Sequence, residues 1–180
     1  YFVSDYLRKE DEALMPRPDR SPERRAELIP VVAKAFSELG YRRATTAELA
    51  RRCGVQETTL YRLWPDKKSM FLAAITHVVE SSTRTWSDTA AREGAGSAAQ
   101  KVLAYEAEHH GELGLYRILF AGLGETDDPE IRTALGAAYE RVAAWIQQRI
   151  DEHRGDAPDR DDRERLKART AAWAAVGLGT

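Results

Sequence analysis

The sequence predicts an all-α protein. No segment alternates apolar and polar residues for long enough to form a strand, and segments rich in Ala, Arg and Glu, which favour helix, recur throughout the 180 residues. N-cap residues, prolines and glycines divide these segments at intervals typical of separate helices. No apolar stretch reaches the roughly 20 residues of a membrane-spanning helix. A single cysteine, Cys53, excludes an internal disulfide and fits a reducing cytoplasm. From these two observations we expect a cytoplasmic protein with no membrane partner.

The first helix is expected to open at the Ser-Pro-Glu run at 21–23, which supplies an N-cap, a proline in the first helical position and an early carboxylate. Residues 1–20 form an N-terminal extension and tether, in which Met15 is a candidate start of the native chain. Gly40 ends the helix as a left-handed residue. Pro30 lies inside the helix and removes a backbone donor, so we expect a kink or a break there.

Two short helices follow. Thr45 and Glu48 fit a capping box that opens the second helix, which reaches about Arg52 before Gly54. The third helix begins around Gln56 and ends before the proline at 65.

Residues 46–65, TAELARRCGVQETTLYRLWP, have the spacing of a helix-turn-helix. Ala50 is small, which lets the third helix cross closely, and Gly54 supplies the turn four residues later. Apolar residues that hold the third helix on the other two follow Ala50 at +5, +10 and +13, namely Val55, Leu60 and Leu63. The pattern predicts a DNA-binding unit, and the alternative is an ordinary helical hairpin within a bundle.

Six positions in and beside the motif extend the pattern: Phe36, Gly40, Tyr41, Thr59, Trp64 and Lys67. With these residues, the segment 21–75 resembles the DNA-binding domain of the tetracycline-repressor (TetR) family of transcriptional regulators. The resemblance implies an N-terminal three-helix helix-turn-helix DNA-binding domain and a C-terminal helical dimerisation and ligand-binding domain. The implied boundaries are residues 21–66 and 67–180.

By this resemblance, residues 56–63 form the recognition helix and lie in the major groove of DNA. Four of its side chains are assigned to base edges: Gln56, Glu57, Thr58 and Arg62. Four residues are assigned to phosphates, which position the domain without reading sequence: Thr45, Thr46, Tyr61 and Lys67. Arg42 or Arg43 assists at longer range, whereas Arg51 and Arg52 either face solvent or contact DNA.

Two residues of the recognition helix depart from the family pattern. Gln56 stands where serine is usual, so the helix has a poorer N-cap. Glu57 places a carboxylate in the first turn, where it favours the helix dipole but is repelled by phosphates. The same carboxylate is alternatively an acceptor for the amino group of cytosine.

Charge is distributed unevenly, although the whole chain carries a formal net charge of −2. Between Met15 and Glu80 there are twelve Lys and Arg against eight Asp and Glu, and residues 81–180 hold thirteen against seventeen. A basic first part joined to an acidic remainder is the charge pattern expected when only the first part binds DNA.

Five more helices are expected after the DNA-binding unit. Asp66, Ser97 and either Asp127 or Asp128 cap three of them, which end before the loop 93–97, near residue 110 and near residue 153. A short helix ends at residue 123, and the last helix runs from residue 163 to the end.

The long helix carries a seam of residues at steps of three and four, which we interpret as a dimer contact. The seam consists of Ile131, Leu135, Ala138, Val142, Trp145 and Arg149, with Ile146 and Ile150 beside it. The last helix adds apolar and small residues among many alanines: Leu166, Thr170, Trp173 and Val176. Two helices from each subunit suit a four-helix bundle on a two-fold axis, as in the family. The alternative is that these faces complete the core of one subunit.

A ligand pocket is expected between the helix that follows Asp66 and the helices of residues 97–123. Its candidate walls are aromatic residues at helical spacing: Trp86, Tyr105, His109, Tyr116 and Phe120. By resemblance, a small and partly apolar effector binds there, shifts the helix that joins the two domains and releases the DNA.

The sequence therefore predicts a sequence-specific DNA-binding transcriptional regulator, a repressor that binds a pseudo-palindromic operator as a homodimer and is released by a small molecule. The alternative is a regulator or activator that acts without a ligand. No cofactor, metal site or enzymatic activity is expected. The single Glu-x-x-His motif, Glu106 to His109, lacks the second copy that a di-iron bundle needs, and there is no P-loop or Gly-x-Ser-x-Gly motif.

Overall fold

A computed structural model describes residues 20–109, 112, 114–154 and 170. Within these ranges the chain is helical and has no strand, which confirms the predicted fold class. The helices are α2 (Ser21–Arg43), α3 (Thr46–Cys53), α4 (Glu57–Leu63), α5 (Lys67–Ala91), α6 (Ala98–His109), α7 (Leu115–Leu123) and α8 (Pro129–Arg154).

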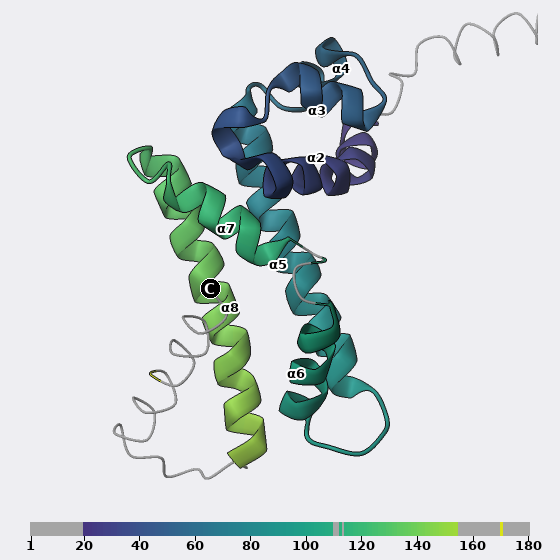
Figure 1. Cartoon of the computed structure of the whole chain (residues 1–180), viewed down its shortest axis with the longest axis vertical. Coiled ribbons are helices and arrows are strands. Elements are labelled where there is room, and N and C mark those ends of the chain that lie inside the picture. The colour runs from purple at the N-terminus through teal and green to yellow at the C-terminus, as the bar shows by residue number, and fades with distance from the viewer. Residues whose placement is uncertain (1–19, 110–111, 113, 155–169, 171–180) are drawn as a thin grey trace, which may run out of the picture.

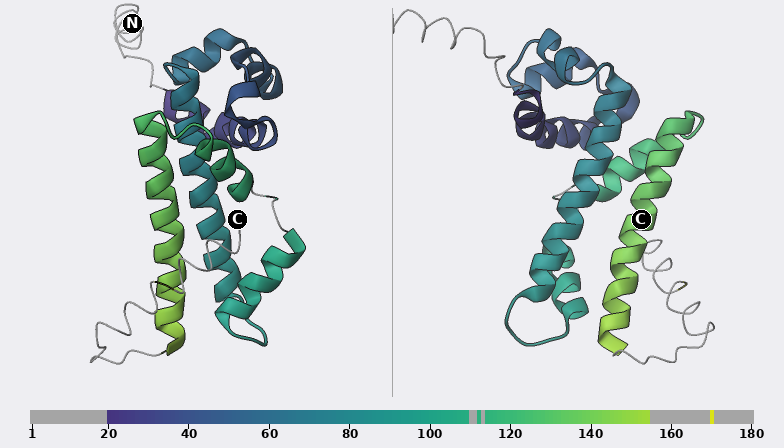
Figure 2. Two further views of the ribbon diagram at one scale, coloured as in Figure 1. Left: turned by 60° about the vertical axis from the view of Figure 1, so that its left-hand side comes forward. Right: turned by 180° about the vertical axis from the view of Figure 1, so that it is seen from behind.

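Helices α2, α3 and α4 form a small unit at one end of the molecule, which we call the head (Figure 1). Helix α5 leaves the head and runs the length of the remaining part, which we call the body, with α8 beside it (Figures 1 and 2). Helix α7 lies under α2 and against both α5 and α8, and α6 packs on the far part of α5. The body is therefore joined to the head both by the continuous helix α5 and by the contact between α2 and α7.

The first helix differs from its prediction at three points. It continues through Pro30 with helical backbone angles, so the expected break is wrong. The carbonyl of Ala26 receives no hydrogen bond from Pro30, which has no backbone N–H. This carbonyl lies on the exposed side of α2, where water can replace the bond. Ser21 lies inside the helix, and Arg20 occupies the N-cap. Gly40 interrupts the helix as predicted, but with φ 75° and ψ 165° instead of left-handed helical angles.

The predicted caps of the body helices are confirmed. The side chains of Asp66, Ser97 and Asp128 accept hydrogen bonds from first-turn backbone N–H groups of α5, α6 and α8, at 2.6, 3.3 and 2.9 Å. The predicted last helix lies outside the described residues except at Thr170, which is helical.

One apolar core runs from the head into the body. Its centre near the junction is an aromatic cluster of Phe36, Tyr41 and Phe71, which joins α2 to α5. The ring of Phe71 lies 5.0 Å from that of Phe36, edge to face, and 4.9 Å from that of Tyr41. Such pairs add to the apolar burial of the rings, so this cluster fixes the head on the body.

The predicted dimer seam on α8 is wrong for its first four residues. Ile131, Leu135, Ala138 and Val142 are buried within the single chain, where α8 packs on α5 and α7. Spacing by three and four identifies an apolar face but not what covers it, and here the chain covers it itself. Trp145 also packs inward, with its ring 5.3 Å from that of Trp86. Leu166, Trp173 and Val176 lie outside the described residues.

Candidate DNA interface and ligand site

The turn between α3 and α4 has the predicted construction. The hydroxyl of Thr45 accepts a hydrogen bond from the N–H of Glu48 at 3.2 Å, which caps α3. Gly54 ends α3 with φ 65° and ψ 31°, angles that glycine adopts without strain. Ala50 and Leu60 are buried where the helices cross. In the described structure, Gln56 is the N-cap of α4 without a side-chain hydrogen bond, as expected for glutamine at this position.

The residues assigned to DNA lie on or directly before α4 and at the starts of α3 and α5. The recognition-helix candidates are exposed on α4, opposite the buried Leu60 and Leu63: Gln56, Glu57, Thr58, Tyr61 and Arg62. Thr45 is exposed at the start of α3, and Thr46 and Lys67 are partly exposed. The arrangement leaves polar side chains free to reach a groove while the apolar side of α4 holds it on the head.

A chain of hydroxyl groups links α3 to the first turn of α4. Tyr61, which is 48% exposed, donates from its hydroxyl to the hydroxyl of Thr46 at 3.2 Å. Thr46 in turn donates to a carboxylate oxygen of Glu57 at 2.7 Å. The Glu57 carboxylate is therefore held beside two residues assigned to phosphates, where its charge opposes a phosphate group.

Lys67 is held at the start of α5 by the end of α2. Its ammonium group donates to the backbone carbonyl of Tyr41 at 3.1 Å and lies 4.4 Å from the centre of the Tyr41 ring. These contacts limit the positions of the ammonium group but use only part of its donor capacity.

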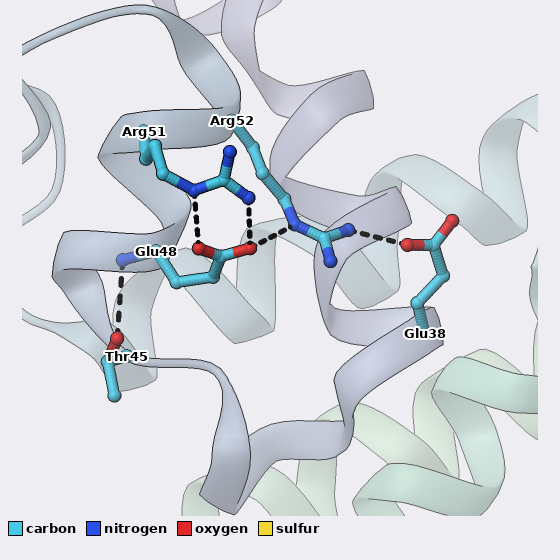
Figure 3. Close-up of polar contacts among 5 residues, drawn as sticks. All are labelled: Glu38, Thr45, Glu48, Arg51 and Arg52. Atoms are coloured by element: carbon cyan, nitrogen blue, oxygen red, sulfur yellow. Dashed lines mark hydrogen bonds and ion pairs between the residues drawn. The ribbon is translucent and has the colours of Figure 1, made fainter.

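Glu48 connects the two arginines of α3 (Figure 3). Its carboxylate receives hydrogen bonds from Arg51 at 2.7 and 2.8 Å and from Arg52 at 2.7 Å, and Arg52 also pairs with Glu38 of α2. The carboxylate therefore does not complete the predicted capping box by returning to the backbone of Thr45. Both arginines have partners within the head, and the side chain of Arg51 is 71% exposed whereas that of Arg52 is 25% exposed. Arg51 thus faces solvent, and contact of either arginine with DNA stays a prediction.

Acid is expected to weaken the head through this network. Hydrogen bonds from Arg51 and Arg52 lower the pKa of Glu48 from 4.5 to about 2. A carboxyl whose pKa is lower in the folded state stabilises the fold fully above its unfolded pKa, and loses that contribution as the pH falls from 4.5 towards 2. The free energy of unfolding in urea should therefore fall between pH 5 and pH 3, and it should fall by more in the wild type than in the Glu48→Gln variant.

Other carboxyl groups titrate in the same range, so the comparison needs a control. Glu23→Gln changes an exposed carboxyl group in the first turn of α2. Its pH dependence is expected to follow the wild type. Equal pH dependence in the wild type and the Glu48→Gln variant would contradict the role of Glu48.

The structure brings together four of the five residues assigned to a ligand pocket. Trp86, Tyr105, His109 and Tyr116 line a cavity of about 10 Å³ between α5, α6 and α7, with Ser82, Glu106 and Leu115. Phe120 is not part of it and is 48% exposed on α7. Their role in ligand binding stays a prediction. The sequence reasoning missed Ser82, although it lies one helical turn before Trp86 on the same face of α5.

Glu106 is the polar centre of this cavity. The indole N–H of Trp86 donates to one of its carboxylate oxygens at 2.5 Å, and the hydroxyl of Tyr116 to the other at 3.4 Å. His109 stacks on Tyr105 with ring centres 4.3 Å apart and donates from Nδ1 to the Tyr105 carbonyl at 2.9 Å. Across the described residues, no group of three or more His, Cys, Asp or Glu side chains is placed to hold a metal ion.

Ion pairs also tie the end of α2 and the start of α5 to the turn between α7 and α8 and to the first turn of α8. Arg42 pairs with Glu125 at 2.7 Å, and Lys68 pairs with Asp128 at 3.2 Å and with Glu130 at 2.7 Å. Arg42 was expected to assist in binding phosphates, and in this structure the body holds it. The turn is therefore a second place where the body contacts residues next to the candidate DNA interface.

Comparisons with known proteins agree with this geometry. Residues 31–74 match the family model described as bacterial regulatory proteins, tetR family. Among curated proteins, the nucleoid occlusion factor SlmA of Haemophilus influenzae (strain PittGG) is 46% identical over 57 residues, or 31% of this chain and 26% of that protein. The match thus spans only about a quarter of the length of that relative.

Two solved structures share the fold across most of the chain. Escherichia coli NemR in its reduced form has a TM-score of 0.64 at 15% identity, covering 86% of this chain and 85% of its own. A TetR-family transcriptional regulator from Agrobacterium tumefaciens has a TM-score of 0.64 at 11% identity, covering 87% of this chain and 83% of its own. In the described part of the chain, no helix is both long and apolar enough to cross a membrane.

The matched segment contains α3, α4 and the beginning of α5, which are the elements that build the exposed recognition surface. The structural likeness extends this agreement to the arrangement of the body helices. Residues 31–74 therefore belong to the TetR family of bacterial regulatory proteins, and the chain shares the fold of a solved TetR-family regulator.

Proposed function

We propose that this protein is a cytoplasmic repressor that binds a pseudo-palindromic operator as a homodimer and is released by a small molecule. Residues 21–66 form the DNA-binding domain, and residues 67–180 form the sensing and dimerisation domain. The observation that carries the proposal is the exposed polar face of α4, held by its buried side against the rest of the head. A recognition helix needs such a face to enter the major groove.

Within this proposal some side chains read base edges and others contact phosphates, according to their positions. Gln56, Thr58 and Arg62 read base edges, because they are exposed on α4. Glu57 accepts from the amino group of cytosine, because Thr46 holds its carboxylate at the start of the helix. The hydroxyl groups and the cation that surround this face contact phosphates: Thr45, Thr46, Tyr61 and Lys67.

The assignment is tested by two alanine variants on DNA recovered by selecting bound sequences from a random pool. Lys67→Ala is expected to weaken binding to all sequences alike and to flatten the dependence of log K on log salt by about 0.9 for each subunit bound. Gln56→Ala is expected instead to relax base preference at one position in each half-site, at a cost of about 1–3 kcal/mol on the preferred site. Fluorescence anisotropy at several salt concentrations measures both effects.

The control for Lys67→Ala is Lys34→Ala, which removes an exposed lysine from α2. If Lys34→Ala flattens the salt dependence as much as Lys67→Ala, the effect is one of overall charge and the assignment of Lys67 is wrong. If Lys67→Ala changes base preference without changing salt dependence, the division of roles is wrong.

Homodimer formation follows from a pseudo-palindromic site, because two heads must meet two half-sites about one helical turn apart. The buried face of α8 packs within the chain, so we propose that its other face meets the partner. That face contains Gly136, Ala137, Glu140 and Ala144, which are exposed in the single chain. Small residues permit the close approach of helices that a subunit contact needs.

Release by a ligand requires that a change in the body reach the head. Helix α7 contacts both α2 and α5, and Ser37 of α2 donates to the carbonyl of Gly114 at 3.3 Å, just before α7. A ligand that moves α6 or α7 would therefore act on α2 through this contact and on Arg42 and Lys68 through the turn after α7.

A regulator that acts without a ligand is the second candidate, and the size of the cavity favours it. A volume of about 10 Å³ holds roughly one water molecule, so the space between α5, α6 and α7 does not hold a larger ligand in this state. Titration of the protein with small molecules, followed by measurement of DNA release, separates the two candidates.

A further inference from the structure

Glu106 is a partly buried carboxylate whose two hydrogen-bond donors among the described residues are neutral. Within the described ranges no lysine, arginine or histidine forms an ion pair with it. Burial and the nearby Glu106 carboxylate raise the pKa of Tyr116, which keeps its hydroxyl group a neutral donor. Because a buried charge is stable only when it is paired or well hydrogen-bonded, this carboxylate is suited to a cation from outside.

The surroundings of Glu106 favour an organic cation over a hydrated metal ion. The rings of Trp86, Tyr105 and His109 line the same cavity, and Trp86 is almost fully buried. Aromatic faces attract cations that carry little hydration, such as alkylammonium groups. The carboxylate repels an anionic ligand at the same place.

Ser82 supplies a second and independent indication of a ligand. Its residue is 1% exposed, it lines the same cavity, and its hydroxyl group has no hydrogen-bond partner among the described residues. An unsatisfied buried hydroxyl is unfavourable, and it is relieved by a group that can donate or accept there. An ammonium N–H group directed at the Ser82 oxygen meets this requirement.

The cavity has to open before such a ligand fits, and α6 is placed to move. Val102 is the one buried residue of this helix, and α6 packs on α5 at the end of the body far from the head. Segments with few buried apolar contacts open at a small cost in free energy. Outward movement of α6 carries Glu106 away from Trp86 and widens the space between them.

We propose that this cavity binds an amine with an apolar or aromatic substituent, in its ammonium form, with Glu106 as the counter-ion and Ser82 as a second acceptor. The ammonium group displaces the indole of Trp86 from the carboxylate, and the substituent lies among the aromatic rings. The proposal rests on the proposed function in one respect, namely that the body is a ligand-sensing domain, and it names the class of ligand.

Three probes with one ring and different charges test the proposal: 2-phenylethylamine, which is an ammonium ion at pH 7, 2-phenylethanol, which is neutral, and 3-phenylpropanoate, which is an anion. Binding to the full chain is measured by calorimetry at pH 7 without DNA. The ammonium ion is expected to bind at least about tenfold more tightly than the alcohol, because a hydrogen bond to a charged group contributes more than one between neutral groups. The anion is expected not to bind. Equal binding of amine and alcohol, or no binding of the amine, overturns the proposal.

Variants at Glu106 separate a ligand site from a structural contact. Glu106→Gln keeps an acceptor for Trp86 and removes the charge, so amine affinity should fall about tenfold or more while alcohol affinity is unchanged. Glu108→Gln, on the exposed side of the same helix, is the matched control and should leave both affinities unchanged. An equal fall in both variants indicates long-range charge attraction and contradicts the site.

Tyr116→Phe keeps the test informative if Glu106→Gln does not fold. It removes one donor that competes for the carboxylate and keeps the ring, so amine affinity is expected to rise, by roughly threefold. A purely structural role of Tyr116 predicts no rise, and a fall would contradict the proposal.

Release of DNA by the amine is measured in a separate experiment on the protein–DNA complex. Amine binding that leaves a protein–DNA complex intact supports the site and contradicts release by this ligand. Failure of the amine to bind a protein that still binds DNA overturns the site and leaves the DNA-binding function standing.

Discussion

Replacing Phe36 with alanine is expected to destabilise the chain by about 3–5 kcal/mol, the usual cost of removing a large aromatic side chain from a core. The Phe36 ring is fully buried and contacts Phe71 edge to face. Alanine removes both the apolar burial and the ring contact, and α2 and α5 are too constrained to close the space. Chemical unfolding in urea should show the loss as a lower midpoint with an unchanged slope.

The same substitution is expected to weaken DNA binding. Tyr41 packs against Phe36 and Phe71 and also holds Lys67 through its carbonyl and its ring. A looser cluster therefore releases a side chain assigned to a phosphate. Phe120→Ala is the matched control, because that ring is 48% exposed and its loss should change stability by less than about 0.5 kcal/mol. A loss below about 1 kcal/mol for Phe36→Ala would contradict the role of the cluster.

Features decided by neighbouring residues were predictable from the sequence. The caps at Thr45, Asp66 and Asp128 and the glycine turn at 54 depend on groups within four residues of one another. The spacing of Ala50, Leu60 and the other apolar residues of the motif predicts almost all of the packing between its helices. These are the parts of the head and of the body helices for which the predictions are confirmed.

Features that depend on distant residues were not predictable. The sequence does not show that Arg52 reaches Glu38 or that Arg42 reaches Glu125, because only the tertiary fold brings these pairs together. A local competition was also missed, because capping-box spacing predicted a backbone contact for Glu48, whereas Arg51 and Arg52, three and four residues further along α3, bind the carboxylate. Pro30 was expected to kink or break α2, but the helix continues through this exposed position with helical backbone angles.

The proposed ligand site lies between these cases. Aromatic residues at helical spacing indicated which faces of α5, α6 and α7 turn towards each other, and Trp86 and Tyr116 do meet. The sequence identified Glu106 only as part of a Glu-x-x-His motif. Spacing alone does not show that its carboxylate oxygens meet the indole of Trp86 and the phenol of Tyr116. Ser82 reads as an ordinary helix residue until its burial is known.

Replacing Val142 with aspartate is expected to unfold the chain and not merely to separate a dimer. Val142 is 6% exposed in the single chain and belongs to the core that α8 shares with α5. An unpaired carboxylate there costs about 3–5 kcal/mol, a large part of the 5–15 kcal/mol that typically stabilises a domain. Circular dichroism and urea unfolding should show a strongly destabilised or unfolded protein at any protein concentration.

Ala144→Asp places the same carboxylate on α8, two residues further on, but on the exposed face. It should leave the fold of the single chain intact, because water still reaches the new charge. If the exposed face of α8 meets the partner, this variant becomes monomeric by light scattering at micromolar concentration and loses operator affinity with its second half-site. A folded monomer from Val142→Asp, together with an unaffected dimer from Ala144→Asp, would reverse the assignment of the two faces of α8.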